Sequence, residues 1–194
     1  SQFDPDSLAT CTIANRVNAL PVAMAARLFY FNATTYAQAA LPLPRTWDDL
    51  FAAGPVFRSR LGAGYFPLDV TFQDVVAVTR AWLVQRSGLP LIDERNRRLN
   101  ASESDLREVA GMYERMVREH VVPSARERAS YGNVAAQEMR PWIDGRYAGT
   151  YQWTSAIGKS ADTLNAGQHI ALAQYPLRSG ARDAGLLYRP AMTL

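Results

Sequence analysis

An aromatic stretch at residues 141–153 constrains the fold more than any other part of the chain. Apolar residues recur near a helical period over residues 134–143, and Gly145 supplies a helix stop because it enters the left-handed region at little cost. From there to Trp153, alternate positions follow the period of two that is typical of a strand. The stretch therefore predicts a helix followed at once by a strand over residues 147–153, with aromatic side chains at the strand's carboxyl end.

Composition limits the classes of protein that this chain can belong to. Its 194 residues and 48% hydrophobic content predict a folded domain with a real core. The formal charge of +3 comes almost entirely from scattered arginines, with Lys159 the only lysine, so we expect no nucleic-acid partner. The single cysteine, Cys11, excludes an internal disulfide framework.

The remaining segments alternate between strand-like and helix-like patterns. Residues 1–16 have few periodic apolar positions and predict an extended arm or one loose turn, whereas residues 17–194 predict one α/β domain. Within it we expect a central mixed sheet flanked by helices, with the first two strands as paired or neighbouring strands. The expected strands span residues 18–24, 27–32, 65–68, 169–176 and 186–188, with an outer hairpin over 89–93 and 98–100. The clearest expected helices begin near Thr46, Thr71 and Ser104.

The sequence offers little for catalysis or metal binding. The two histidines, His120 and His169, fall in different predicted elements, and no Gly-x-Ser-x-Gly elbow is present. No Gly-rich phosphate loop or metal-ligand spacing is found either. We therefore expect no catalytic group, no metal and no cofactor. No apolar run approaches the ~20 residues that span a bilayer, and no signal peptide is evident, so we expect a mature chain or a piece of a longer one.

Four segments together resemble the sugar-binding type 1 group of extracytoplasmic solute-binding proteins of ABC importers. The segment at 44–50, Pro-Arg-Thr-Trp-Asp-Asp-Leu, is similar to a helix start of that family and is the most specific of the four. Residues 20–32 resemble its strand pair, residues 144–153 its helix-to-strand element with a ligand-stacking tryptophan, and residues 170–176 a later strand. The resemblance extends from about Asn18 to Tyr188.

The resemblance implies a periplasmic-binding-protein-like fold of type II, of which this chain would be the carboxyl-side lobe. It implies a sugar ligand held between two lobes, hinge closure around that ligand, docking of the closed form on an ABC permease, and an amino-side lobe that is missing here. It implies a periplasmic or otherwise extracytoplasmic location, with a lipid anchor conceivable in the full-length parent, and no enzymatic activity.

The strand end at residues 151–153 is the first candidate ligand site. Trp153 offers a flat face that could stack on a sugar ring, and the resemblance favours this over a core tryptophan. For Tyr151 the sequence favours a ligand contact and a core position about equally.

A second group of candidates surrounds the junction between the strand at 65–68 and the next helix. Asp69 and Thr71 could line a ligand crevice or simply cap the helix, and Phe72 is a second possible stacking residue. Arg27 could bind an anionic or hydroxyl-rich ligand, although pairing with a neighbouring carboxylate is the commoner fate of such a residue.

Two other classes of function remain open at this point. One is a carbohydrate-active enzyme domain that uses acidic residues such as Asp69 and Asp144. The other is the sensory domain of a regulator, although the chain carries no recognisable signalling or DNA-binding module.

Overall fold

The computed structural model describes residues 4–22, 25–89, 91–93, 95–132, 134–178, 186–188 and 191–193. For residues 72, 73, 186–188 and 191–193 the description covers the backbone alone.

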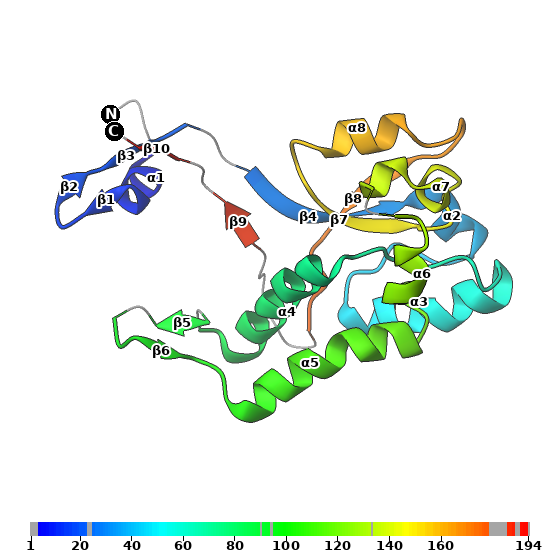
Figure 1. Cartoon of the computed structure of the whole chain (residues 1–194), viewed down its shortest axis with the longest axis horizontal. Coiled ribbons are helices and arrows are strands. Elements are labelled where there is room, and N and C mark those ends of the chain that lie inside the picture. The colour runs from blue at the N-terminus through cyan, green and yellow to red at the C-terminus, as the bar shows by residue number, and fades with distance from the viewer. Residues whose placement is uncertain are drawn as a thin grey trace.

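A four-stranded sheet is built around β4 (Ala25–Asn32), which has hydrogen-bonded neighbours on both edges. One edge pairs antiparallel with β7 (Gly149–Trp153). The other pairs antiparallel with β9 (Leu186–Tyr188) and then, further along, with β8 (Ile170–Ala173). Parallel bridges then join Phe66 to Tyr147 and Asp69 to Thr150, so the sheet is mixed. This mixed sheet with flanking helices confirms the predicted fold class (Figure 1).

The position of β4 at the centre follows from its aromatic run. Phe29 and Phe31 are fully buried and their ring centroids lie 6.1 Å apart. Trp47 meets Phe29 edge-on at 6.1 Å, and Tyr36 meets Phe31 at 5.3 Å. A strand that buries such rings needs helices against it. These rings come from α3 (Trp47–Arg60) and α2 (Ala33–Gln38).

The three long helices all begin with a reciprocal capping box. In each, a hydroxyl accepts the amide of the residue three positions on, whose carboxylate accepts the cap's own amide. The boxes are Thr46–Asp49 for α3, Thr71–Asp74 for α4 (Phe72–Ser87) and Ser102–Asp105 for α5 (Glu103–Arg118). The predicted starts at Thr46 and Thr71 are confirmed, and the cap of α5, Ser102, lies two residues before the expected Ser104.

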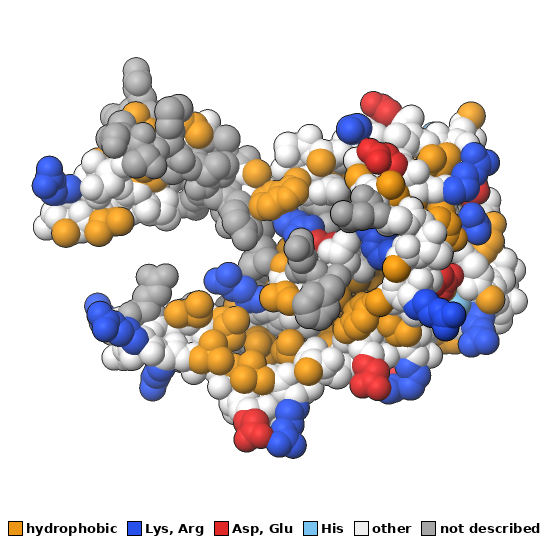
Figure 2. Space-filling view, in the orientation of Figure 1, with side chains coloured by type: hydrophobic (Ala, Val, Ile, Leu, Met, Phe, Trp, Pro, Cys, Tyr) orange, Lys and Arg blue, Asp and Glu red, His pale blue; other side chains and the backbone are white. Residues whose placement is uncertain are grey.

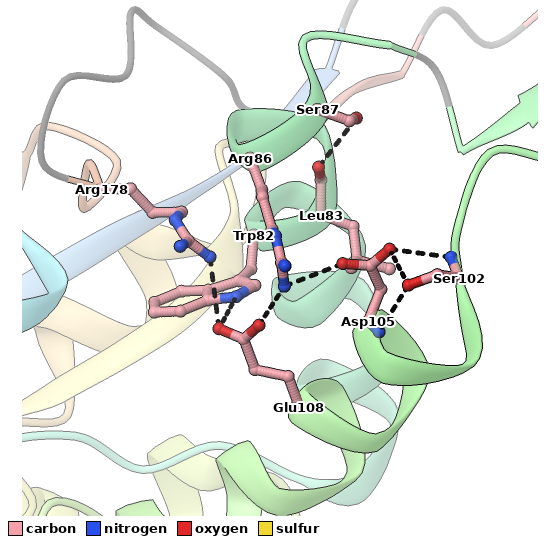
Figure 3. Close-up of polar contacts among 8 residues, drawn as sticks. All are labelled: Trp82, Leu83, Arg86, Ser87, Ser102, Asp105, Glu108 and Arg178. Atoms are coloured by element: carbon pink, nitrogen blue, oxygen red, sulfur yellow. Dashed lines mark hydrogen bonds and ion pairs between the residues drawn. The ribbon is translucent and has the colours of Figure 1, made fainter.

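An ion-pair network ties α5 to α4 and to the segment after β8 (Figure 3). Glu108 accepts hydrogen bonds from Trp82 Nε1 at 3.2 Å, from Arg178 at 3.4 Å and from Arg86. Arg86 also lies 2.8 Å from Asp105, and the Arg178 guanidinium covers the Trp82 ring at 4.3 Å. The helical layer is therefore fixed at its edge by several coupled charges. A small hairpin, β5 (Ile92–Asp93) with β6 (Arg98–Leu99), connects α4 to α5 as predicted.

A small unit beside the main body holds the elements nearest to both ends of the chain. It contains α1 (Pro5–Thr10), the hairpin of β1 (Thr12–Ile13) and β2 (Arg16–Val17), and β3 (Ala19–Pro21) paired with β10 (Ala191–Thr193). Figure 1 shows it set apart from the long helices α3, α4 and α5, with β4 and β9 leading to it.

This arrangement adds detail to one expectation about the amino-terminal residues and corrects another. The described part of the expected arm holds a short helix, which Asp4 caps by accepting the amide of Ser7, and most of a hairpin. The strand expected over 18–24 does not neighbour the next strand, because both edges of β4 are occupied by β7, β8 and β9. It pairs with β10 instead.

The region before β7 also differs from its prediction. The helix expected over 134–143 is a 3-10 turn, η1 (Ala136–Glu138), followed by one helical turn, α7 (Arg140–Ile143). Pro141 lacks an amide hydrogen and fits only in a first helical turn, so the helix restarts there. Gly145, at φ 72°, ends it as expected. The segment at 65–68 contributes the bridge at Phe66 instead of a regular strand.

Two further short helices lie in the part of the chain that the structure describes. One, α8 (Ile157–Asp162), follows β7 and accepts the Trp142 indole N–H at Ser160 O, 2.9 Å away. The other, α6 (Ala125–Ala129), lies between α5 and η1. Among the residues that the structure describes, none of the helices has both the length and the apolar character needed to cross a bilayer.

Two glycines in helices make a matched test of the packing between α3 and α5. A Cβ on Gly54 would lie 2.0 Å from the backbone oxygen of Glu119, whereas a Cβ on Gly111 would meet nothing within 4 Å. We expect Gly54→Ala to cost at least about 2 kcal/mol through overpacking. Gly111→Ala should gain about 0.5–1 kcal/mol through helix propensity. Urea unfolding of the two variants measures both; equal changes would contradict the close contact.

Candidate functional site

A pocket of about 440 Å³ lies where the amino end of α4 meets α5 and α6, and we call it the α6 pocket. Its wall combines a guanidinium, two hydroxyl-bearing side chains and small apolar residues. The lining residues are Val70, Thr71, Tyr113, Ala125, Arg128, Ala129, Gly132 and Val134. A concave site with few polar groups and an apolar lining suits a small ligand.

Asp69 lies beneath this pocket and is 3% exposed. Its backbone amide donates to Gly149 O at 2.8 Å, which fixes it against β7. One carboxylate oxygen, Oδ2, is 3.3 Å from Arg128 Nη1, whereas Oδ1 is buried with no hydrogen-bond partner among the described residues. Burial raises the pKa of Asp69 to about 6, against the lowering effect of Arg128. The predicted ligand residue Asp69 is thus a buried support of the pocket.

Arg128 connects that support to the pocket itself. Its Nη1 points inward, 3.0 Å from the sulfur of Met139 as well as 3.3 Å from Asp69. Its other guanidinium nitrogens make no hydrogen bond to any described residue, and its side chain is 19% exposed. It therefore retains N–H donors for a ligand in the α6 pocket, in the forked geometry that suits carboxylates.

Thr71 lines the same pocket and is held by a second ion pair. Asp74 Oδ2 accepts from the amide and the hydroxyl of Thr71, at 2.8 and 2.7 Å. The other Asp74 oxygen accepts from Arg27, which also donates to Tyr151 O at 3.0 Å. The structure therefore brings together three predicted site residues, Arg27, Thr71 and Tyr151, through Asp74. Arg27 has a neighbouring carboxylate, which was the alternative expected from sequence.

The two aromatic candidates on β7 flank Arg27. Its guanidinium lies 4.5 Å from the ring centroid of Tyr151 and 5.4 Å from that of Trp153. Tyr151 is 2% exposed and packs on Phe29 at 4.9 Å, whereas Trp153 is partly exposed at the strand's carboxyl end. Tyr151 thus supports Arg27 from the core, and Trp153 keeps an accessible part. Phe72 opens α4 as expected, but its side chain lies outside the described part of the chain.

Arg128 and Tyr113 are the site residues that sequence reasoning missed. Arg128 lies in a segment that the sequence analysis assigned to no element, yet Ser124 caps α6 by accepting the amide of Glu127. A Ser-x-x-Glu pattern at 124–127 is a helix-start signal that could have located α6. No local signal places α6 against the segment that carries Asp69. Within the described residues, no group of three or more His, Cys, Asp or Glu side chains could hold a metal ion.

Comparison with known proteins identifies the family. The model of the bacterial extracellular solute-binding protein family matches residues 1–168. The chain belongs to this family. No curated protein matches the sequence.

Solved structures agree with this assignment. The chain is 42% identical to a periplasmic oligogalacturonide binding protein from Yersinia enterocolitica in complex with saturated digalacturonic acid, with a TM-score of 0.89. It is 33% identical to a periplasmic solute binding protein from Pectobacterium atrosepticum, also at 0.89. Maltose-bound MalE3 of T. maritima, at 19% identity and 0.67, shares the fold. Each match covers 98% of this chain but 47–48% of the other, so the chain spans about half the length of these relatives.

The buried Asp69 carboxyl predicts a pH-dependent stability. Its pKa is raised from 3.8 to about 6, so the folded state holds the proton more tightly than the unfolded chain does. The free energy of unfolding should therefore fall as pH rises through this window and stay low above pH 6. Asp69→Asn should gain up to roughly 3 kcal/mol at pH 7.5 and almost nothing at pH 4. Urea unfolding at both pH values measures this; a gain that does not change with pH would contradict it.

Because of the Arg27–Asp74 pair, we expect two similar capping boxes to contribute differently to the free energy of unfolding. Asp49→Ala removes an exposed box from α3 and should cost about 1 kcal/mol. Asp74→Ala removes the equivalent box from α4 and also leaves Arg27, 17% exposed, without its carboxylate. It should cost about 3 kcal/mol. Chemical unfolding of both variants makes the comparison, and equal costs would show that the ion pair adds nothing.

Proposed function

We propose that this chain is one lobe of a two-lobed solute-binding protein that captures an acidic oligosaccharide outside the cytoplasm and delivers it to an ABC permease. Membership of the extracellular solute-binding family supports the binding role and an extracytoplasmic, for instance periplasmic, location. A span of about half the length of its relatives supports the single lobe. The division into an arm over residues 1–16 and a lobe over 17–194, and a lipid anchor in the parent, remain predictions.

The observation that carries the ligand class is Arg128 in the α6 pocket. A uronate residue combines a carboxylate with ring hydroxyls, and the pocket combines a guanidinium with the hydroxyls of Thr71 and Tyr113. Arginine binds a carboxylate through two parallel hydrogen bonds, which gives both strength and orientation. The relative at 42% identity is named for oligogalacturonide, which is a polymer of such units.

Trp153 would add stacking to this recognition. Its partly exposed ring lies at the end of β7, and Arg27 connects it through Asp74 to Thr71 on the pocket wall. We propose Trp153 and Phe72 as stacking residues, and Asp69, Tyr151 and Arg27 as residues that support the site from behind.

The α6 pocket supports the proposal of a second lobe, because this chain supplies only one wall of contacts. The ordering of ligand and side chains costs several kcal/mol, and one wall of contacts offsets little of it. Closure of an amino-side lobe over the α6 pocket would supply the other wall. We therefore expect the 194-residue chain alone to bind sugars far more weakly than micromolar.

The enzyme alternative finds no support in the positions of its two carboxylates. Asp69 is buried and paired with Arg128. Asp144 lies in ion pairs with Arg140 and Arg146 and does not line the α6 pocket. Members of this family bind solutes, so we propose a binding role without turnover.

The decisive experiment compares two arginines on the same short helix. Arg128 lines the pocket, whereas Arg126 is exposed on α6 and outside it. In the two-lobed parent protein, we expect Arg128→Gln to weaken binding of digalacturonic acid at least tenfold, measured by calorimetry, because it loses a charged fork worth about 1.5–3 kcal/mol. Arg126→Gln should bind as tightly as the unmodified protein.

A neutral disaccharide such as maltose serves as the ligand control. Equal loss for both arginine variants, or tighter binding of maltose than of digalacturonic acid, would overturn the acidic ligand class. Micromolar binding by the 194-residue chain alone would overturn the two-lobe argument.

A further inference from the structure

The Asp69 carboxylate is held asymmetrically beside the α6 pocket. Oδ2 faces Arg128 at 3.3 Å, and Oδ1 is buried with no described hydrogen-bond partner. A buried carboxylate oxygen without a donor costs free energy, and this cost falls when a proton makes the carboxyl neutral. The carboxyl is therefore built to accept a proton, directly behind the arginine that lines the pocket.

We propose that Asp69 is a positioning residue that holds Arg128 at the pocket wall and takes up a proton when an acidic ligand binds, thereby setting the charge that the ligand meets. This inference rests on the proposed acidic ligand. It concerns a residue that does not touch the ligand and acts through Arg128.

The other groups around Asp69 do not compete for this proton. Among the described residues, the groups that interact electrostatically with Asp69 are Arg128 from α6, Asp74 from α4, Tyr113 from α5 and Tyr147 from the segment before β7. The negative charge of Asp74 is paired with the positive charge of Arg27. Burial raises the pKa of both Tyr113 and Tyr147, so both stay neutral near pH 6.

The charge of the site then depends on one proton. With Asp69 ionised, the Asp69–Arg128 pair is neutral; with Asp69 protonated, it carries one positive charge. The pKa of Asp69, about 6, lies far above the value of about 3–4 expected for a uronate carboxyl, so of these two carboxyls only Asp69 changes its protonation state between pH 5 and 7.5. An incoming carboxylate pairs with the freed charge of Arg128 and disfavours the Asp69 anion. The proton moves from solvent buffer to the Asp69 carboxyl, and no bond to the ligand forms.

The test is calorimetry of digalacturonic acid binding to the two-lobed parent protein at pH 6.5, in two buffers of different ionisation enthalpy. We expect net uptake of a fraction of a proton per ligand, up to one. Affinity should rise roughly tenfold from pH 7.5 to pH 5, because reciprocal linkage makes the ligand and the proton strengthen each other's binding. A purely structural role for Asp69 would give neither result.

Asp69→Asn is the diagnostic variant, because the amide keeps the shape of the carboxyl and an oxygen for Arg128. We expect it to bind at pH 7.5 about as tightly as the unmodified protein does at pH 5, with no proton uptake and no pH dependence. Asp48→Asn, which removes an exposed carboxylate on α3, should behave like the unmodified protein. Persistent proton uptake by Asp69→Asn would overturn the inference.

Two further measurements distinguish failure of the Asp69 inference from failure of the proposed function. If Asp69→Asn fails to fold, the carboxyl carbon of Asp69 can be titrated by NMR in the unmodified protein, with and without ligand; a titration midpoint that does not rise with ligand overturns the inference. Absence of digalacturonic acid binding at every pH would defeat the proposed function. Binding that is independent of pH would defeat this inference alone.

Discussion

The close approach of three segments at Gly149 determines where the site lies. A Cβ there would meet the Phe31 ring and the carbonyl oxygen of Pro67, each at 2.6 Å. Because glycine has no side chain, β7 packs between β4 and the segment before α4 at backbone distance. Gly149 O then accepts the amide of Asp69. Thr71, the cap of α4, follows two residues later, so the pocket wall is positioned by the core of the sheet.

Two arginine–aspartate pairs lie next to this contact, and they differ in how completely the aspartate oxygens are hydrogen-bonded. Arg27 and Asp74 are both mostly buried, and Asp74 also receives two hydrogen bonds from Thr71. That ion pair fixes the start of α4. Asp69 is more deeply buried, has one satisfied oxygen and shares Arg128 with the pocket. The Arg27–Asp74 pair therefore stabilises the start of α4. In our proposal, the Asp69–Arg128 pair changes its charge when a ligand binds in the pocket.

Local signals in the sequence predicted the parts of the fold that local chemistry determines. The capped starts of α3 and α4, the aromatic strand β4 and the strand after Gly145 all depend on neighbours within a few residues. The helix expected over 134–143 failed because Pro141 overrode the apolar period. Thr71 and Asp69 were located near the site, but Arg128 was not, because its contact with Asp69 joins residues 59 positions apart. The pairing of β3 with β10 is longer in range still.

The connection between the two units of the structure passes through residues that also hold the pocket. Both β4 and β9 lead toward the small unit, and Arg27 lies on β4 opposite Trp153 on one edge and Leu186 on the other. Arg27 also donates a hydrogen bond to Asp74 at the start of α4. Asp74 accepts from Thr71, the cap of this helix, which lines the pocket. Among the described contacts, Arg27 therefore joins the strand that leads to the small unit with the helix start that lines the pocket.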